Sequence, residues 1–151
     1  MTLQFNAKGA PPMPAAARAF GIGGLIPFAG GAFAVCFAPE IKAQAATALI
    51  GYGAVILSFL GGIRCGFAVL EGVSASWEAY GLSVIPSLIG WIGALIAGPE
   101  GLLILAVALA IWFFTERTMP PALPLPRWYL PLRGLLTGIA TLSLIAAAIF
   151  W

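Results

Sequence analysis

The side chains that could do chemistry are few in this chain, and they lie far apart. There is no histidine, and all five acidic residues are glutamates: Glu40, Glu71, Glu78, Glu100 and Glu116. This composition excludes His-based acid–base catalysis, Ser-His-Asp triads and His-containing metal or haem sites. We therefore expect a protein that is not an enzyme and that uses no metal or other cofactor.

Arg64 is the charged residue that most needs an explanation. It lies within residues 52–66, an apolar stretch interrupted by glycines and long enough to form part of a membrane span. A charge inside lipid must be paired, enclosed in protein or extended to the headgroups. We expect Arg64 to be the one charge deep enough to need a partner. Glu71, about two helical turns further on, is the first candidate partner, and Glu78 and Glu116 are others.

Two roles for Arg64 stay open on sequence alone. In a structural role, its side chain reaches the headgroups or closes a salt bridge between the second span and a loop. In a functional role, its planar guanidinium binds an anionic headgroup, a carboxylate or a phosphate, a geometry that suits arginine well. The two cysteines, Cys36 and Cys65, are expected near opposite membrane faces, too far apart for a disulfide.

The composition indicates an integral membrane protein. Of 151 residues, 62% are hydrophobic and only 8% are charged, and the mean hydropathy is +1.05. Soluble domains carry about 25% charged residues, so this chain could not cover its own surface in water. The net charge of +2 is too small to indicate a nucleic-acid partner.

Five segments have the length and apolar character of membrane-spanning helices, which need about 20 residues. They are residues 16–37, 43–70, 80–97, 99–116 and 129–151, preceded by a flexible tail at 1–15. The sequence therefore predicts an all-α, polytopic bundle of five transmembrane helices in one domain, 16–151. Gly98 and Pro99 predict a tight hairpin between the third and fourth spans. The proline-rich residues 118–131 predict an extended connection before the fifth.

The basic residues are distributed unequally between the two sides of the predicted bundle. Of the 7 Lys and Arg residues, Lys42 alone falls on the far side from the N-terminus; the others are Lys8, Arg18, Arg64, Arg117, Arg127 and Arg133. Because cytoplasmic loops carry the excess of Lys and Arg, we expect a cytoplasmic N-terminus and a periplasmic C-terminus. The tail does not have the pattern of a signal peptide or presequence. A multi-pass protein of the bacterial inner membrane is the expected setting.

Small residues recur at helical spacing in several spans. In the second span Ala54, Ser58, Gly62 and Gly66 follow one another every four residues, and the fifth span has Gly134 and Gly138. Such residues let helices approach closely in lipid. They either pack the bundle internally or face a partner subunit, and the fifth span is the more plausible partner surface. Prolines inside two spans, Pro27 and Pro86, predict helix kinks.

Two motifs resemble a known family. Gly24-Leu-Ile-Pro-Phe28 and Tyr52-Gly-Ala-Val-Ile-Leu-Ser-Phe-Leu-Gly-Gly-Ile-Arg64 are similar to those of the uncharacterised membrane family typified by mitochondrial transmembrane protein 69 and its bacterial relatives. The resemblance implies a multi-spanning protein of an inner membrane and supplies no activity. It also implies a tryptophan after the arginine, where this chain has Cys65.

Two functions are compatible with these observations. The first is a non-enzymatic accessory or assembly subunit that packs against a larger respiratory or photosynthetic membrane complex. The second is a bundle that binds a lipid or small molecule, with an architecture like that of the translocator-protein family. The expected partners are membrane lipids and other membrane subunits, with a small-molecule ligand as the alternative.

Overall fold

The computed structural model describes residues 12–121 and 123–151, and every regular element within these ranges is a helix. The elements are α1 (Ala15–Gly23), α2 (Ile26–Phe37), η1 (Pro39–Ile41), α3 (Lys42–Glu71), η2 (Gly72–Ser74), α4 (Trp77–Leu95), α5 (Pro99–Thr118) and α6 (Tyr129–Ile149). Five units are long and apolar enough to cross a membrane: Ala15–Phe37, Pro39–Ser74, Trp77–Leu95, Pro99–Thr118 and Tyr129–Ile149. The predicted all-α architecture with five spans is confirmed. Residues 1–11 of the predicted tail lie outside the described residues.

The first span is divided into α1 and α2 by a break at Gly24 and Leu25. Pro27, which the sequence predicts to kink this span, lies at the start of α2, where a proline costs no helical hydrogen bond. The Tyr52 hydroxyl of α3 donates to the Gly24 carbonyl at 2.9 Å, and its ring meets that of Phe28 edge-on at 5.0 Å. A neighbouring span thus satisfies one backbone group at the break, as the bilayer interior requires.

The remaining helix ends follow local signals in the sequence. α4 begins at Trp77, earlier than expected, because the Ser76 hydroxyl caps it by accepting a hydrogen bond from the Ala79 amide at 3.1 Å. Gly98 has a φ of 92°, a left-handed conformation that favours glycine, and Pro99 opens α5 directly after it. The predicted tight hairpin between the third and fourth spans is therefore present.

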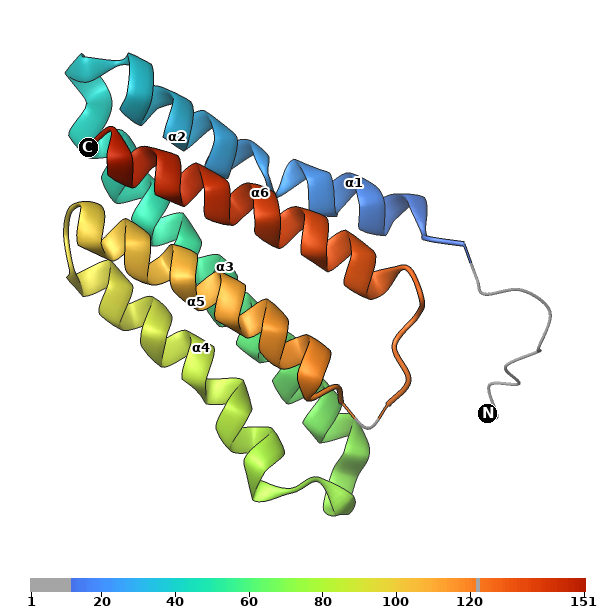
Figure 1. Cartoon of the computed structure of the whole chain (residues 1–151). Coiled ribbons are helices and arrows are strands. Elements are labelled where there is room, and N and C mark those ends of the chain that lie inside the picture. The colour runs from blue at the N-terminus through green and yellow to red at the C-terminus, as the bar shows by residue number, and fades with distance from the viewer. Residues whose placement is uncertain (1–11, 122) are drawn as a thin grey trace.

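Figure 1 shows the five spans as one bundle of long, roughly aligned helices. α3 packs most extensively on α4, α5 on α6, and α2 on both α3 and α6. α5 contributes the centre of the core, because its Leu102, Leu105 and Leu109 are almost completely buried. One end of the bundle holds the start of α1, the turn from α3 to α4 and the connection from α5 to α6. We call it the charged end, because most of the charged residues of the described chain lie there.

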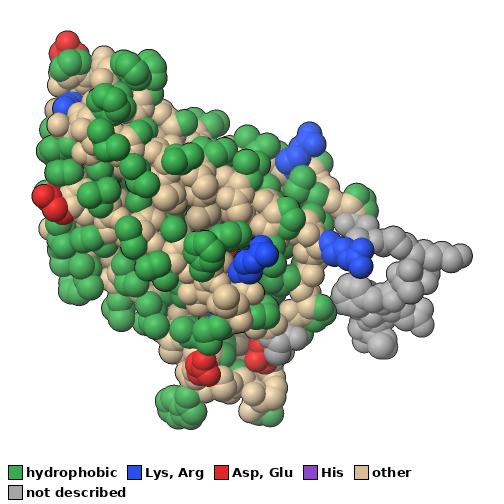
Figure 2. Space-filling view, viewed as in Figure 1, with side chains coloured by type: hydrophobic (Ala, Val, Ile, Leu, Met, Phe, Trp, Pro, Cys, Tyr) green, Lys and Arg blue, Asp and Glu red, His purple; other side chains and the backbone are tan. Residues whose placement is uncertain are grey.

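The surface of the bundle also distinguishes the charged end from the apolar remainder. Figure 2 shows hydrophobic side chains over much of the visible face, whereas most of the visible basic side chains gather near the charged end. Large apolar residues such as Phe20, Phe37 and Ile149 are more than two-thirds exposed. In a membrane these side chains face lipid, where their exposure carries no penalty.

Candidate functional site

A buried ion pair joins α5 to α6 at the charged end. Arg133 and Glu116 are only 8% and 6% exposed. Arg133 donates to Glu116 Oε2 from Nη2 at 3.0 Å and from Nε at 3.2 Å, and its Nη1 donates to Thr137 Oγ1 at 3.5 Å. The expectation that Arg64 is the one charge that needs a partner is therefore wrong. Arg133 is more buried than Arg64 in the described chain, and Glu116 is its partner.

The sequence contained a signal for this pair. Glu116 lies two residues before α5 ends and Arg133 four residues after α6 begins, so both flank the same connection. Consecutive spans joined by a short connection are antiparallel, which brings such positions to the same depth. What the sequence did not show is that both side chains turn inward, since that depends on how each helix is rotated in the bundle.

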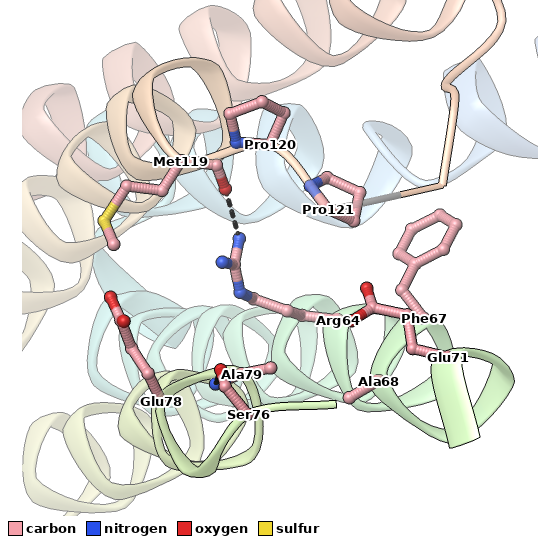
Figure 3. A pocket seen from close by; sticks show the side chains of 10 residues that line it. All are labelled: Arg64, Phe67, Ala68, Glu71, Ser76, Glu78, Ala79, Met119, Pro120 and Pro121. Atoms are coloured by element: carbon pink, nitrogen blue, oxygen red, sulfur yellow. Dashed lines mark hydrogen bonds between the residues drawn. The ribbon is translucent and has the colours of Figure 1, made fainter. Parts of the chain in front are cut away.

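Arg64 lies on the wall of a half-open pocket at the same end, shown in Figure 3. Its Nη1 donates to the carbonyl oxygen of Met119 at 2.7 Å, which ties α3 to the connection after α5. Its Nε is enclosed and has no hydrogen-bond partner in the described part of the chain. The pocket has a volume of about 220 Å³ and is lined by ten residues: Arg64, Phe67, Ala68, Glu71, Ser76, Glu78, Ala79, Met119, Pro120 and Pro121.

The predicted pairing of Arg64 with Glu71 has a geometric basis but stays a prediction. Glu71 lies two turns along α3 and lines the same pocket as Arg64, as does Glu78 on α4. The Arg64 guanidinium donates a hydrogen bond to the Met119 carbonyl oxygen. Glu116, the other candidate, is engaged by Arg133. It shares with Arg64 and Tyr129 the lining of a small adjoining cavity of about 10 Å³, so the two charged sites are neighbours.

The predicted stripe of small residues on α3 divides into an inner and an outer part. Ser58 Oγ lies 2.9 Å from Ser87 Oγ of α4, and the backbone of Ala54 approaches Gly90 of α4 so closely that a Cβ there would lie 2.9 Å from the Ala54 carbonyl oxygen. By contrast, a Cβ added at Gly62 or Gly66 would meet no described atom within 4 Å. The first two members pack the bundle, and the last two do not.

Gly62 and Gly66 belong to an exposed face that runs along α3. The residues of this outer face of α3 follow one another at intervals of four, three, four and three positions, and all are exposed: Val55, Phe59, Gly62, Gly66 and Val69. An alternation of three and four is the spacing with which one helix presents a continuous seam to another. The glycines form the middle of that seam.

The fifth span, predicted as the more plausible partner surface, is half engaged within the chain. A Cβ added at Gly134 of α6 would lie 3.2 Å from the ring of Phe113 on α5, so this glycine allows close packing of the two helices. Gly138 has open space in place of a Cβ contact among the described residues. Among the glycines of the two predicted stripes, α6 therefore offers one open position, whereas α3 offers two in succession.

The second predicted kink residue, Pro86, is fully buried inside α4. It packs against Gly61 of α3, and a Cβ at Gly61 would also clash with the Ser83 carbonyl oxygen. Gly61 therefore belongs to the inner packing of α3, although its sequence neighbour Gly62 faces outward. Whether Pro86 bends α4 stays a prediction.

In the part of the chain that the structure describes, the residues able to bind metal are not gathered together. Within residues 12–121 and 123–151, no group of three or more His, Cys, Asp or Glu side chains could hold a metal ion. Cys36 and Cys65 are both free thiols.

The fold and the charged end define a polytopic helical membrane protein with five spans. Residues 13–149 match a family described as "Protein of unknown function (DUF3429)", and this chain belongs to that family. It is 33% identical over 155 residues to Transmembrane protein 69 of Xenopus tropicalis, covering 97% of this chain and 59% of that protein. Transmembrane protein 69 of Mus musculus is 30% identical over 132 residues, covering 85% and 53%.

The resemblance predicted from the first two spans is thus confirmed. The chain spans little more than half the length of the curated relatives it matches. No solved structure matches this chain.

Proposed function

We propose that this protein is a non-enzymatic accessory or assembly subunit that packs against a larger membrane complex through the outer face of α3. The observation that carries this proposal is the pair of open glycines, Gly62 and Gly66, in the middle of an exposed apolar seam. A Cβ at either glycine would meet no described atom within 4 Å, so packing within the described chain does not account for this pair.

The physical argument rests on how helices associate in lipid. Lipid chains are as apolar as leucine, so exposure of apolar side chains gives no driving force, and association depends on close backbone approach at small residues. Gly62 and Gly66 lie between Phe59 and Val69 on this face, and those two residues are 61% and 60% exposed. A transmembrane helix of a partner could place a larger side chain against the glycines and contact the flanking residues.

The non-enzymatic part of the proposal is supported by the state of the acid–base groups. The sequence has no histidine or aspartate, and the buried glutamate of the described chain, Glu116, is held by Arg133. A general base needs a free lone pair directed at a substrate proton.

For the setting, we propose the bacterial inner membrane with the charged end in the cytoplasm. Arg18, Arg64, Arg117, Arg127 and Arg133 belong to this end, whereas Lys42 lies at the opposite end. The excess of basic residues on the cytoplasmic side supports this orientation. Reporter fusions at either terminus test it, since five spans put the two termini on opposite sides.

The test of the subunit proposal is a pull-down of the tagged chain from native membranes in mild detergent, read by native gel and mass spectrometry. We expect stoichiometric recovery of a larger membrane complex, respiratory or photosynthetic in kind. Gly62→Leu and Gly66→Leu should abolish recovery while the chain stays folded. Gly30→Leu on α2 is the matched control, because a Cβ there also meets no described atom within 4 Å. Recovery of the chain alone, or equal loss in the control, would overturn the proposal.

A second candidate function, the binding of a lipid or small molecule, is favoured by one observation. An apolar cavity of about 160 Å³ opens between the first span, α3, α5 and α6, and Arg133 and Thr137 are among the residues that line it. A ligand with a hydrocarbon part and one polar group would suit it. Native mass spectrometry of the purified chain tests this: a bound molecule present in the wild type should be lost in Leu136→Trp, which fills the cavity.

A further inference from the structure

We propose that the pocket beside Arg64 binds the headgroup of phosphatidylethanolamine, a phosphate joined to a primary ammonium. This inference concerns a different surface from the outer face of α3, and it stands or fails independently of the subunit proposal. It is carried by the opposed charges on the pocket walls and by the position of the pocket at a membrane boundary.

The pocket lies at the depth of lipid headgroups. It is formed where α3 ends, where α4 begins and where the chain leaves α5, so it marks the end of three spans at once. Trp77 and Tyr80, at the start of α4, are 96% and 40% exposed, and such aromatic residues favour the membrane–water interface. A phospholipid beside the bundle would therefore present its headgroup, and not its acyl chains, to this pocket.

One wall of the pocket is suited to a phosphate. The guanidinium of Arg64 is positioned by its 2.7 Å hydrogen bond to the Met119 carbonyl oxygen, and it borders the opening. That bond uses one of the five N–H groups that a guanidinium can donate. Charge-assisted hydrogen bonds from a planar guanidinium are the strongest and most directional that a protein offers to phosphate.

The opposite wall is suited to an ammonium group. Figure 3 shows the carboxylate of Glu78, on the first turn of α4, across the opening from the Arg64 guanidinium. This carboxylate disfavours a headgroup that is only anionic, and Arg64 disfavours one that is only cationic. A zwitterion with its phosphate toward Arg64 and its ammonium toward Glu78 satisfies both charges.

The Glu78 carboxylate also discriminates between zwitterionic headgroups. A primary ammonium has three N–H donors for carboxylate oxygens, whereas the trimethylammonium of phosphatidylcholine has none. The pocket, at about 220 Å³, is small and is bordered by Ser76 and Ala79 of α4. We therefore expect ethanolamine to be preferred to choline, and both to be preferred to the anionic phosphatidylglycerol.

The experiment is native mass spectrometry of the purified full chain with equimolar phosphatidylethanolamine, phosphatidylcholine and phosphatidylglycerol of identical acyl chains. We expect about tenfold more bound phosphatidylethanolamine than either competitor, the ratio that about 1.4 kcal/mol of binding preference gives. Glu78→Gln should bring the ratio of ethanolamine to choline lipid close to one, and Arg64→Gln should reduce binding of both. Glu100→Gln, a change at the opposite end of the bundle, is the matched control and should keep the preference.

A second variant and a soluble competitor complete the experiment. Because Arg64→Gln also removes the contact with Met119, the exposed Glu78→Gln variant carries the test if the arginine variant does not fold. Free phosphoethanolamine separates the sources: displacement of the lipid at millimolar concentration supports the same site with a soluble ligand, and retention supports a membrane lipid. Equal binding of the three lipids by the wild type, a preference for phosphatidylglycerol, or an unchanged preference in Glu78→Gln would overturn the proposal.

Discussion

Two arginines lie at the same end of the bundle in opposite circumstances. Arg133 is enclosed between α5 and α6, with Glu116 and Thr137 as hydrogen-bond partners. Arg64 borders a half-open pocket and binds a backbone carbonyl of the connection after α5. Both are cations near a membrane boundary, and only their surroundings differ.

The difference shows how to separate structural from functional charges in a membrane bundle. A charge that is buried and fully paired holds helices together, because removing its partner leaves an uncompensated charge in a medium of low polarity. A charge on the wall of an open pocket contributes little to folding and stays accessible to a ligand. The same contrast between enclosed and open positions applies to Gly61 and Gly62.

The largest expected effect comes from breaking the enclosed pair. Glu116→Ala should lower the free energy of unfolding by about 3–5 kcal/mol, because Arg133 would remain buried without a counter-charge. Unfolding by heat or SDS in detergent measures it. Glu100→Ala, at the opposite end of the bundle, is the control and should be nearly neutral. A loss in Glu116→Ala no larger than in the control would show that the pair is dispensable.

Gly61 and Gly62, adjacent on α3, test the same contrast between enclosed and open positions, with a smaller expected effect on stability. Gly61→Ala should cost about 1–3 kcal/mol, as overpacking does, because its Cβ clashes with the backbone of α4 at Ser83. Gly62→Ala should leave the unfolding free energy unchanged or raise it, since its Cβ meets open space. The same unfolding assay compares the two, and equal losses would contradict the division of α3 into an inner and an outer side.

The hydrogen bond between Tyr52 and Gly24 tests how much a neighbouring span stabilises the break in the first span. Tyr52→Phe removes only the hydroxyl that binds the Gly24 carbonyl, and we expect a loss of about 1 kcal/mol. Tyr80→Phe is the matched control, because that hydroxyl meets the Ala68 carbonyl oxygen at a longer 3.4 Å. The thermal midpoint in detergent should fall for the first variant and change less for the second.

The smallest effect on stability is expected at the open charge. Arg64→Gln should change the unfolding free energy by less than about 1 kcal/mol, since it loses one exposed hydrogen bond to a carbonyl. Arg64→Lys serves as the variant that keeps the charge. If Arg64→Gln instead destabilised the chain as strongly as Glu116→Ala, Arg64 would be a structural residue and the contrast drawn above would be wrong.

Hydropathy and local signals were sufficient to predict most of the fold. The five spans follow from apolar length, and the hairpin between α4 and α5 follows from Gly98 and Pro99, because these residues act through their own backbone geometry. The sequence also predicts that α6 begins at Tyr129, directly after the proline-rich connection, as the structure shows. Such features depend only on residues close together in sequence.

The candidate sites depend on helix rotation, which the sequence does not encode locally. The sequence predicts that Ala54, Ser58, Gly62 and Gly66 share one face, but a step of four residues advances about 40° beyond a full turn of a helix. Over three steps this drift reaches about 120°, so Ala54 faces α4 while Gly66 faces outward. The inward turn of Arg133 and Glu116 escaped prediction for the same reason.

The divided first span has a consequence for how the chain enters the bilayer. α1 and α2 contain 9 and 12 residues, and each is shorter than the roughly 20 residues needed to cross alone. The Gly24 carbonyl at their junction is hydrogen-bonded by Tyr52 from the following span. As the chain assembles in the bilayer, the carbonyl at the break of the first span therefore gains this hydrogen-bond partner only when the second span lies beside it.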